Sequence, residues 1–138
     1  MIKQVKRFII VFCLIMAFCA SVSVLADDNI IQVIIYTGQG SKPSDVLVCS
    51  NHINFDGVNS IYSTNNLYVE LFEEGTLFNT CIVSLKLVPG TGWIAGEWYH
   101  ILTNYDLGRT NVPLFINLDP EGPIAGCYGA GRLENLAN

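Results

Sequence analysis

Apolar and polar residues alternate along several stretches of the chain, with the period of two that is typical of half-buried β-strands. The clearest stretch is residues 112–118 (VPLFINL), in which Val112, Leu114, Ile116 and Leu118 fall on one face. Other apolar or alternating runs predict further strands at residues 30–37, 45–50, 67–73, 77–88, 93–101 and 124–128.

Turn-forming residues separate these runs, and the strongest turn signal is residues 89–92 (PGTG). Two polar segments, residues 51–59 (NHINFDGVN) and 104–111, are predicted to be loops, and residues 132–138 a helical turn or a loose tail. No segment has the pattern of an amphipathic helix. The sequence therefore predicts an all-β fold, an antiparallel β-sandwich of about seven to eight strands such as an immunoglobulin-like one, with a small β-barrel as the alternative.

The first 26 residues differ from the rest and are predicted to be a secretory signal peptide. A positively charged start (KQVKR, residues 3–7) precedes an unbroken apolar run at residues 8–20, and Ala26 ends the segment with a small side chain. An uncleaved membrane anchor is the alternative, because a membrane span needs about 20 apolar residues. The short charged and apolar regions are typical of bacterial export signals. We therefore expect residues 27–138 to form a single domain, secreted or periplasmic after cleavage near Ala26.

The part of the chain after Ala26 is strongly acidic. It holds all twelve Asp and Glu residues but only four Lys and Arg residues, which gives a net charge of −8. Nucleic-acid binding depends on cations that neutralise phosphates, and adsorption to anionic lipid has the same requirement. We therefore expect no nucleic-acid partner, and no membrane partner in the absence of calcium.

Aromatic residues are the strongest indication of a binding role. Trp93, Trp98, Tyr99 and Tyr105 lie within one stretch of 13 residues, and Trp and Tyr side chains dominate binding hot spots. In a strand Trp98 and Tyr99 point to opposite faces, so at least one of them is expected in the core. These aromatics predict an exported binding protein with a protein or glycan ligand, such as an inhibitor or effector directed at a host or a competitor.

Motifs for catalysis are missing from the sequence. Its only imidazoles are those of His52 and His100. Neither the serine elbow pattern GxSxG nor the zinc-binding pattern HExxH occurs. We therefore expect a protein that is not an enzyme, with a small secreted hydrolase as a second alternative.

Acidic and amide residues in the predicted loops and turns form a candidate cation site. Oxygen ligands from separate loops would converge at one end of a sandwich, and calcium takes such ligands. The candidate ligands are Asn54, Asp56, Asp106, Asp119 and Glu121. Solvated turn residues are the competing interpretation, so we expect no cofactor, with calcium as the ion only in the alternative.

Residues 96–101 (GEWYHI) follow an alternating strand and a Pro-Gly turn. In this setting they resemble the strand ending of C2-type domains, which are eight-stranded sandwiches that bind calcium and lipid through acidic end loops. The resemblance implies a C2-like sandwich and an alternative function, metal-assisted binding of a membrane or another ligand.

Three cysteines remain after Ala26, and an exported chain meets an oxidising compartment. Cys81 falls on the inward face of the run 77–88, although Asn79 interrupts that face and indicates a bulge or a strand start just after it. We expect a disulfide between Cys81 and Cys127, with Cys49 as a buried free thiol. A bridge between Cys49 and Cys81 is the competing pairing.

Overall fold

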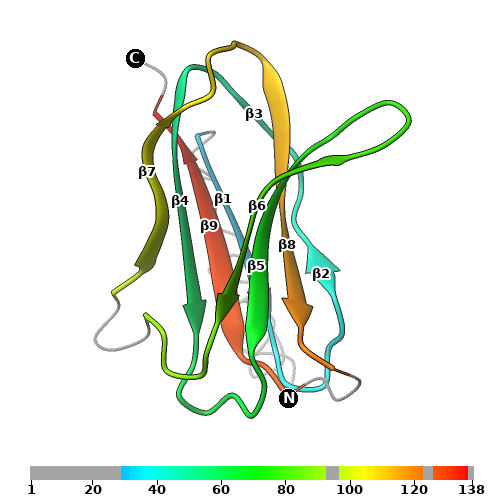
Figure 1. Cartoon of the computed structure of the whole chain (residues 1–138), viewed down its shortest axis with the longest axis vertical. Coiled ribbons are helices and arrows are strands. Elements are labelled where there is room, and N and C mark those ends of the chain that lie inside the picture. Colours follow the sequence, from blue (N-terminus) through cyan, green and yellow to red (C-terminus); the bar gives the residue numbers. More distant parts are fainter. Residues whose placement is uncertain (1–28, 93–96, 123–125, 137–138) are drawn as a thin grey trace, which may run out of the picture.

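A computed structural model describes residues 29–92, 97–122 and 126–136 of the chain (Figure 1). The described residues form strands and connecting turns, with no helix that could cross a membrane. The strands are β1 (Ile30–Ile35), β2 (Lys42–Pro43), β3 (Leu47–Cys49), β4 (His52–Asn59), β5 (Leu67–Glu73), β6 (Thr80–Leu87), β7 (Tyr99–Asp106), β8 (Val112–Pro120) and β9 (Gly129–Asn135). The proposed signal peptide and its cleavage site lie outside the described residues.

The strands form two antiparallel sheets that pack face to face (Figure 1). Sheet A has the order β1-β9-β4-β7, and sheet B has the order β2-β8-β5-β6, with β3 also paired to β8. Ser44 bridges the interval between β2 and β3, because its amide donates to the Ile116 carbonyl at 2.8 Å and its hydroxyl accepts from the Ile116 amide at 2.9 Å. The predicted β-sandwich is confirmed, and the sheets do not close into the alternative barrel.

The order of the strands is that of a jelly roll, a double-sheet form of the sandwich. When β2 and β3 are counted as one interrupted strand, every connection crosses to the other sheet except the hairpin from β5 to β6. An immunoglobulin sandwich instead places its first two strands side by side in one sheet. Crossing connections bring residues from distant parts of the chain onto neighbouring strands, and they build the site described below.

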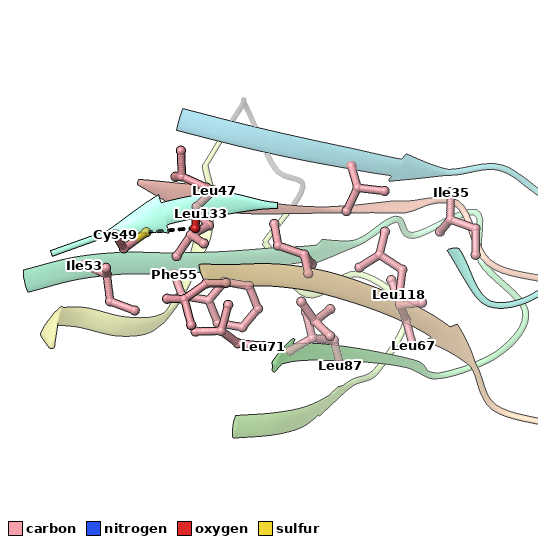
Figure 2. Packing of buried hydrophobic residues seen from close by; sticks show 14 of the residues in the cluster. Ile35, Leu47, Cys49, Ile53, Phe55, Leu67, Leu71, Leu87, Leu118 and Leu133 are labelled. Carbon is pink, nitrogen blue, oxygen red and sulfur yellow. Dashed lines mark hydrogen bonds between the residues drawn. The ribbon is translucent and has the colours of Figure 1, made fainter. Parts of the chain in front are cut away.

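The core fills the space between the two sheets (Figure 2). The alternating residues predicted on the inner face of β8 are all buried: Val112, Leu114, Ile116 and Leu118. Among the described residues, Phe55 on β4 is the largest fully buried side chain, and it lies in the same cluster as Leu71 of β5. Close packing of these side chains from both sheets supplies most of the apolar burial that stabilises the domain.

Glycines on the inner side of sheet A allow the core side chains of sheet B to approach its backbone. A Cβ atom at Gly129 would lie 2.5 Å from Leu67 Cδ2, and one at Gly131 would lie 2.7 Å from Ile116 Cγ2. Both distances are shorter than carbon atoms can adopt without displacement. Close packing of sheet B against the central strand β9 therefore requires glycine at positions 129 and 131.

Residues 51–59 are predicted to be a loop, but His52–Asn59 form the central strand β4, so that prediction is wrong. Ile53 and Phe55 point into the core and are fully buried. Asn54 and Asp56, which alternate with them, lie on the opposite face and are hydrogen-bonded to side chains of β9. Residues of this kind usually favour turns. Here their side-chain hydrogen bonds to a neighbouring strand allow them to lie within a β-strand.

The end of the chain also differs from the expectation. Arg132 and the residues up to Asn135 belong to β9, which lies between β1 and β4, and so they are neither a helical turn nor a loose tail. The expected strand at 93–101 is displaced, because β7 begins at Tyr99 and continues to Asp106 through part of the expected loop. Of the expected strand 124–128, only residues 126–128 are described, and these are not in a strand.

The hairpin between β5 and β6 confirms one part of the expectation and corrects another. β6 begins at Thr80, directly after Asn79, as the interrupted pattern indicated. Leu77, the first residue of the expected strand 77–88, instead lies before β6 and is 85% exposed. Cys81 is also exposed, because the register between β5 and β6 shifts at Leu71 and Phe72.

The expected disulfide between Cys81 and Cys127 is not formed, because the two thiols lie near opposite ends of β5. The Cys127 thiol donates to the carbonyls of Asn65 and Asn66, just before β5, whereas Cys81 pairs opposite Phe72 near its end. Six extended residues span about 20 Å, and a disulfide needs Cα atoms within about 7 Å. The three cysteines of the described residues are free; Cys49 is buried as expected, and Cys127 is buried as well.

We expect one thiol of the folded domain to react quickly with a reagent such as DTNB, and two more to react only after unfolding. Cys81 is exposed, although partial burial and the nearby Glu70 raise its pKa, whereas Cys49 and Cys127 are buried. Burial raises the pKa of Cys49 to about 11 and also raises the pKa of Cys127. Reaction requires the thiolate and access of the reagent to it. Cys81→Ser should remove the fast phase and Cys49→Ser should not. A fast phase that survives Cys81→Ser would contradict this assignment.

Candidate functional site

A buried carboxylate on the outer face of sheet A, the face turned away from sheet B, organises the candidate site. Asp56 follows Phe55 on β4 and therefore points away from the core, yet it is only 1% exposed. Its Oδ2 accepts hydrogen bonds from Arg132 Nη2 at 2.6 Å and Arg132 Nε at 3.0 Å. Its Oδ1 lies 2.6 Å from Nδ1 of His100. One carboxylate thus joins the side chains of three strands, β4, β9 and β7.

The register of sheet A explains this convergence. Asp56 is paired with Arg132 on one side and with His100 on the other. Side chains of directly paired residues lie on the same face of a sheet, close enough to interact. The crossing connections of the fold therefore place an acid, a cation and an imidazole in one row, although they are far apart in the sequence.

Trp98 covers the cation of this row. The guanidinium carbon of Arg132 lies 4.7 Å from the centre of the Trp98 ring, within the range of a cation–π interaction. Trp98 thus packs on the cation that binds Asp56, on a face with no second sheet above it. We call Asp56, His100, Arg132 and Trp98 the Asp56 cluster.

His100 is the most accessible ionisable group of the Asp56 cluster, with 67% of its side chain exposed. Its Nδ1 is engaged by Asp56, and a carboxylate at that distance favours the proton on Nδ1. The neutral ring then presents Nε2 as a hydrogen-bond acceptor, and the protonated ring presents it as a donor. The cluster therefore offers an oriented nitrogen that can serve either role.

A second polar row lies beside the first on the same face. Asn54 Nδ2 donates to Glu134 Oε2 at 3.1 Å, and Asn54 Oδ1 accepts from the amide of Asn104 at 2.9 Å. Asn54 and Glu134 are also paired in register, two residues along from Asp56 and Arg132. The two rows form a patch of fixed hydrogen-bonding groups with one aromatic ring at its margin.

Of the four aromatic residues predicted to bind, only Trp98 is placed in this patch. Tyr99 and Tyr105 are 46% and 41% exposed, but they pair with Gly57 and Ile53, on the side of sheet A that carries the core residues. Trp93 lies outside the described residues. The described part of the chain therefore does not assemble the aromatics into one platform, and the polar partners of Trp98 come from other strands.

The five candidate calcium ligands are also separated. Asn54 and Asp56 lie on sheet A and are engaged as described above, while Asp106, at the end of β7, accepts from the amide of Gly108. Asp119 and Glu121 lie at the end of β8 in sheet B, where Glu121 binds Lys86 at 3.1 Å. Among the described residues, no group of three or more His, Cys, Asp or Glu side chains is close enough to hold a metal ion.

Comparison with known proteins adds no further assignment. No protein-family model matches the chain, and no significant similarity to a curated protein or to a solved structure was found. A jelly roll by itself supports many functions, so the function has to be argued from the site.

Proposed function

We propose that the protein is an exported binding protein that takes a glycan on the outer face of sheet A, with the Asp56 cluster at the centre of the site. The observation that carries this proposal is the buried Asp56 carboxylate, which fixes His100 and Arg132 beside Trp98. An ion pair removed from solvent contributes little net stability compared with apolar packing. The Asp56–Arg132 pair on this outer face is therefore better explained by a role in orienting the side chains of the cluster than by a role in stability.

The chemistry of the patch favours an uncharged polyhydroxylated ligand. Asp56 and Arg132 offset each other's charge, so neither a strong anion nor a strong cation is favoured there. Hydroxyl groups of a sugar both donate and accept hydrogen bonds, which suits the exposed His100 and the amide of Asn54. The flat apolar face of a pyranose suits the Trp98 ring, because aromatic side chains combine a large apolar area with specific geometry.

Export is part of the same proposal and is supported by the sequence of residues 1–26. A charged start, an apolar run and a small residue at Ala26 are the parts of a secretory signal. Outside the inner membrane of a bacterium, glycans of its own envelope or of a host or competitor are accessible. Protein recovered from the periplasm or the medium should begin at Asp27, which intact mass measures directly.

We expect Trp98→Ala to abolish glycan binding while the protein stays folded. The substitution removes the aromatic surface and frees the Arg132 guanidinium, and losses at central aromatic positions commonly exceed about 2 kcal/mol of binding energy. Binding is measured by screening the protein on a glycan array and titrating the best ligand calorimetrically. Tyr62→Ala is the matched control, because Tyr62 is an aromatic residue that is 82% exposed in the loop after β4.

Two outcomes would count against glycan binding at this site. The first is that the unmodified protein binds no glycan on a broad array at millimolar or better affinity. The second is that Trp98→Ala and Tyr62→Ala bind a glycan equally well, which would move the site away from the Asp56 cluster.

One observation favours a hydrolase as a second candidate function. An exposed imidazole oriented by a buried carboxylate, as in His100 and Asp56, is the arrangement that prepares a general base. Among the described residues no hydroxyl or thiol is hydrogen-bonded to His100, so a water molecule would have to be the nucleophile. The bound glycan should then gain new reducing ends on incubation, and His100→Ala should stop their release. If the glycan stays intact, the protein binds it without hydrolysing it.

A further inference from the structure

The hairpin between β5 and β6 carries the most exposed large apolar side chains among the described residues. Leu77 is 85% exposed and Phe78 is 86% exposed, at adjacent positions in the turn of the hairpin. Figure 1 shows this hairpin, in green, projecting beyond the body of the sandwich. We call residues 74–79 the hairpin tip.

Contacts within the hairpin tip and with strand β8 fix the shape of the tip. The amide of Gly75 donates to Asn79 Oδ1 at 3.2 Å, and the amide of Glu74 donates to the Pro113 carbonyl at 2.9 Å. A Cβ atom on residue 75 would overlap the Phe78 carbonyl oxygen, so only glycine fits the turn. Leu77 and Phe78 are therefore held outside the fold in a defined turn, and such pre-organisation lowers the entropic cost of binding.

The outer face of sheet B continues this apolar surface next to the hairpin tip. Phe72 and Phe115 stack across β5 and β8 with ring centres 5.4 Å apart. Val48 pairs with Pro113 on the edge strand β3, and Val46 lies just before β3, in the interval that follows β2. Val46 is 41% exposed and Val48 is 55% exposed. The apolar rows thus extend across the sheet from its edge to the base of the hairpin.

The other half of the same face is polar and satisfies its own hydrogen bonds. Glu70 accepts from Ser84 at 3.0 Å and from Asn117 at 2.9 Å, and Asn117 accepts from Ser41 at 2.9 Å. These side chains form a connected polar network and add no exposed apolar surface to the face. The apolar half and the hairpin tip therefore form the exposed apolar surface of this region, and such a surface is typical of an interaction site.

The charge around the apolar half indicates what kind of molecule covers it. Asp45 and Glu74 are exposed at its margin, and no cation of the described residues forms an ion pair with either. Glu73 is held by Arg109 at 2.6 Å. Excess negative charge on the surface and on residues 27–138 as a whole disfavours a second copy of the chain and an anionic lipid surface.

We propose that the hairpin tip and the adjoining apolar rows of sheet B dock a basic, amphipathic segment of a partner protein. Leu and aromatic side chains of the partner would cover Leu77, Phe78 and the Phe72–Phe115 stack, and Lys or Arg beside them would meet Asp45 and Glu74. This surface lies on the outer face of sheet B, away from the Asp56 cluster on sheet A. A glycan and a partner protein can therefore be bound at the same time.

The test uses the purified domain and a fluorescent synthetic peptide of about 18 residues with Leu and Lys at helical amphipathic spacing. Fluorescence anisotropy should show saturable binding, and Leu77→Ser with Phe78→Ser should weaken it by about tenfold or more, as expected for central apolar anchors. Ile61→Ser with Tyr62→Ser is the matched control, since these residues are 60% and 82% exposed in another loop. Trp98→Ala should bind the peptide normally, which separates this proposal from glycan binding.

A matched peptide with Glu in place of every Lys should bind at least about tenfold more weakly if charge complementarity operates. Equal affinity for both peptides, or for the hairpin-tip variant and its control, would overturn the proposal. Concentration-dependent dimers lost in the hairpin-tip variant would assign the surface to a second copy of the chain. Vesicle binding lost in that variant, without peptide binding, would assign it to lipid, and either result would also overturn the proposal.

Discussion

Phe55→Ala is expected to lower the free energy of unfolding by about 3–5 kcal/mol, the range for deleting a large aromatic side chain from a packed core. Phe55 is fully buried on the central strand β4 and is the largest fully buried side chain among the described residues. Its removal leaves a cavity between the two sheets that the surrounding leucines can fill only in part (Figure 2). A loss of this size is a large fraction of the stability of a domain of this length.

Urea denaturation followed by tryptophan fluorescence measures the change, and the chain provides a matched control. Phe78→Ala is the same substitution at a position that is 86% exposed, so its effect should stay within about 0.5 kcal/mol. If the two substitutions destabilise the protein equally, Phe55 does not occupy the core and residues 52–59 are not a central strand.

The position of Phe55 shows where the sequence was informative about the fold and where it was not. Strand β8 was predicted well because its apolar residues alternate without interruption and one whole face is buried. In residues 52–58 the alternation of Ile53 and Phe55 with Asn54 and Asp56 is also present, but Asn, Asp and Gly are typical of turns. The polar residues are compatible with a strand only because their partners lie on β7 and β9, which the local sequence does not reveal.

Strand β9 was missed for a related reason. Its sequence, GAGRLEN, contains few strand-forming residues. Gly129 and Gly131 are needed because Leu67 and Ile116 of sheet B approach the backbone closely, and this requirement arises only from the packing of two sheets. In β9, one of the two central strands of sheet A, tertiary packing thus outweighs the low strand propensity of the sequence.

The candidate site was predictable only in part. Trp98 is identifiable because aromatic residues are distinctive, but the sequence indicates Asp56 only as a candidate calcium ligand and Arg132 only as part of a tail. These two residues are 76 positions apart and meet only because β4 and β9 are neighbours. A pattern along the chain cannot show such a contact, and the alternation in residues 52–58 was the one signal that pointed toward Asp56 as a side chain on an outer face.

Asp56→Asn is expected to destabilise the domain by about 3 kcal/mol, because it leaves the Arg132 guanidinium without its counter-charge in a partly buried position. The amide has nearly the same size as the carboxylate, so the loss reflects charge and hydrogen bonding rather than a cavity. Glu73→Gln is the control for geometry, since the Glu73–Arg109 pair has the same 2.6 Å separation but is much more exposed. Its effect should be far smaller, because exposed pairs are screened by solvent.

A double substitution separates the ion pair from the rest of the cluster. Asp56→Leu with Arg132→Met replaces both charges by apolar side chains, and it should recover most of the stability lost in Asp56→Asn, since neither charge is then buried alone. It should not recover glycan binding, because His100 loses the carboxylate that orients it. Equal stability losses in Asp56→Asn and Glu73→Gln would contradict the burial of this carboxylate. Full glycan binding by the double variant would show that the Asp56 cluster stabilises the sheet without orienting a ligand.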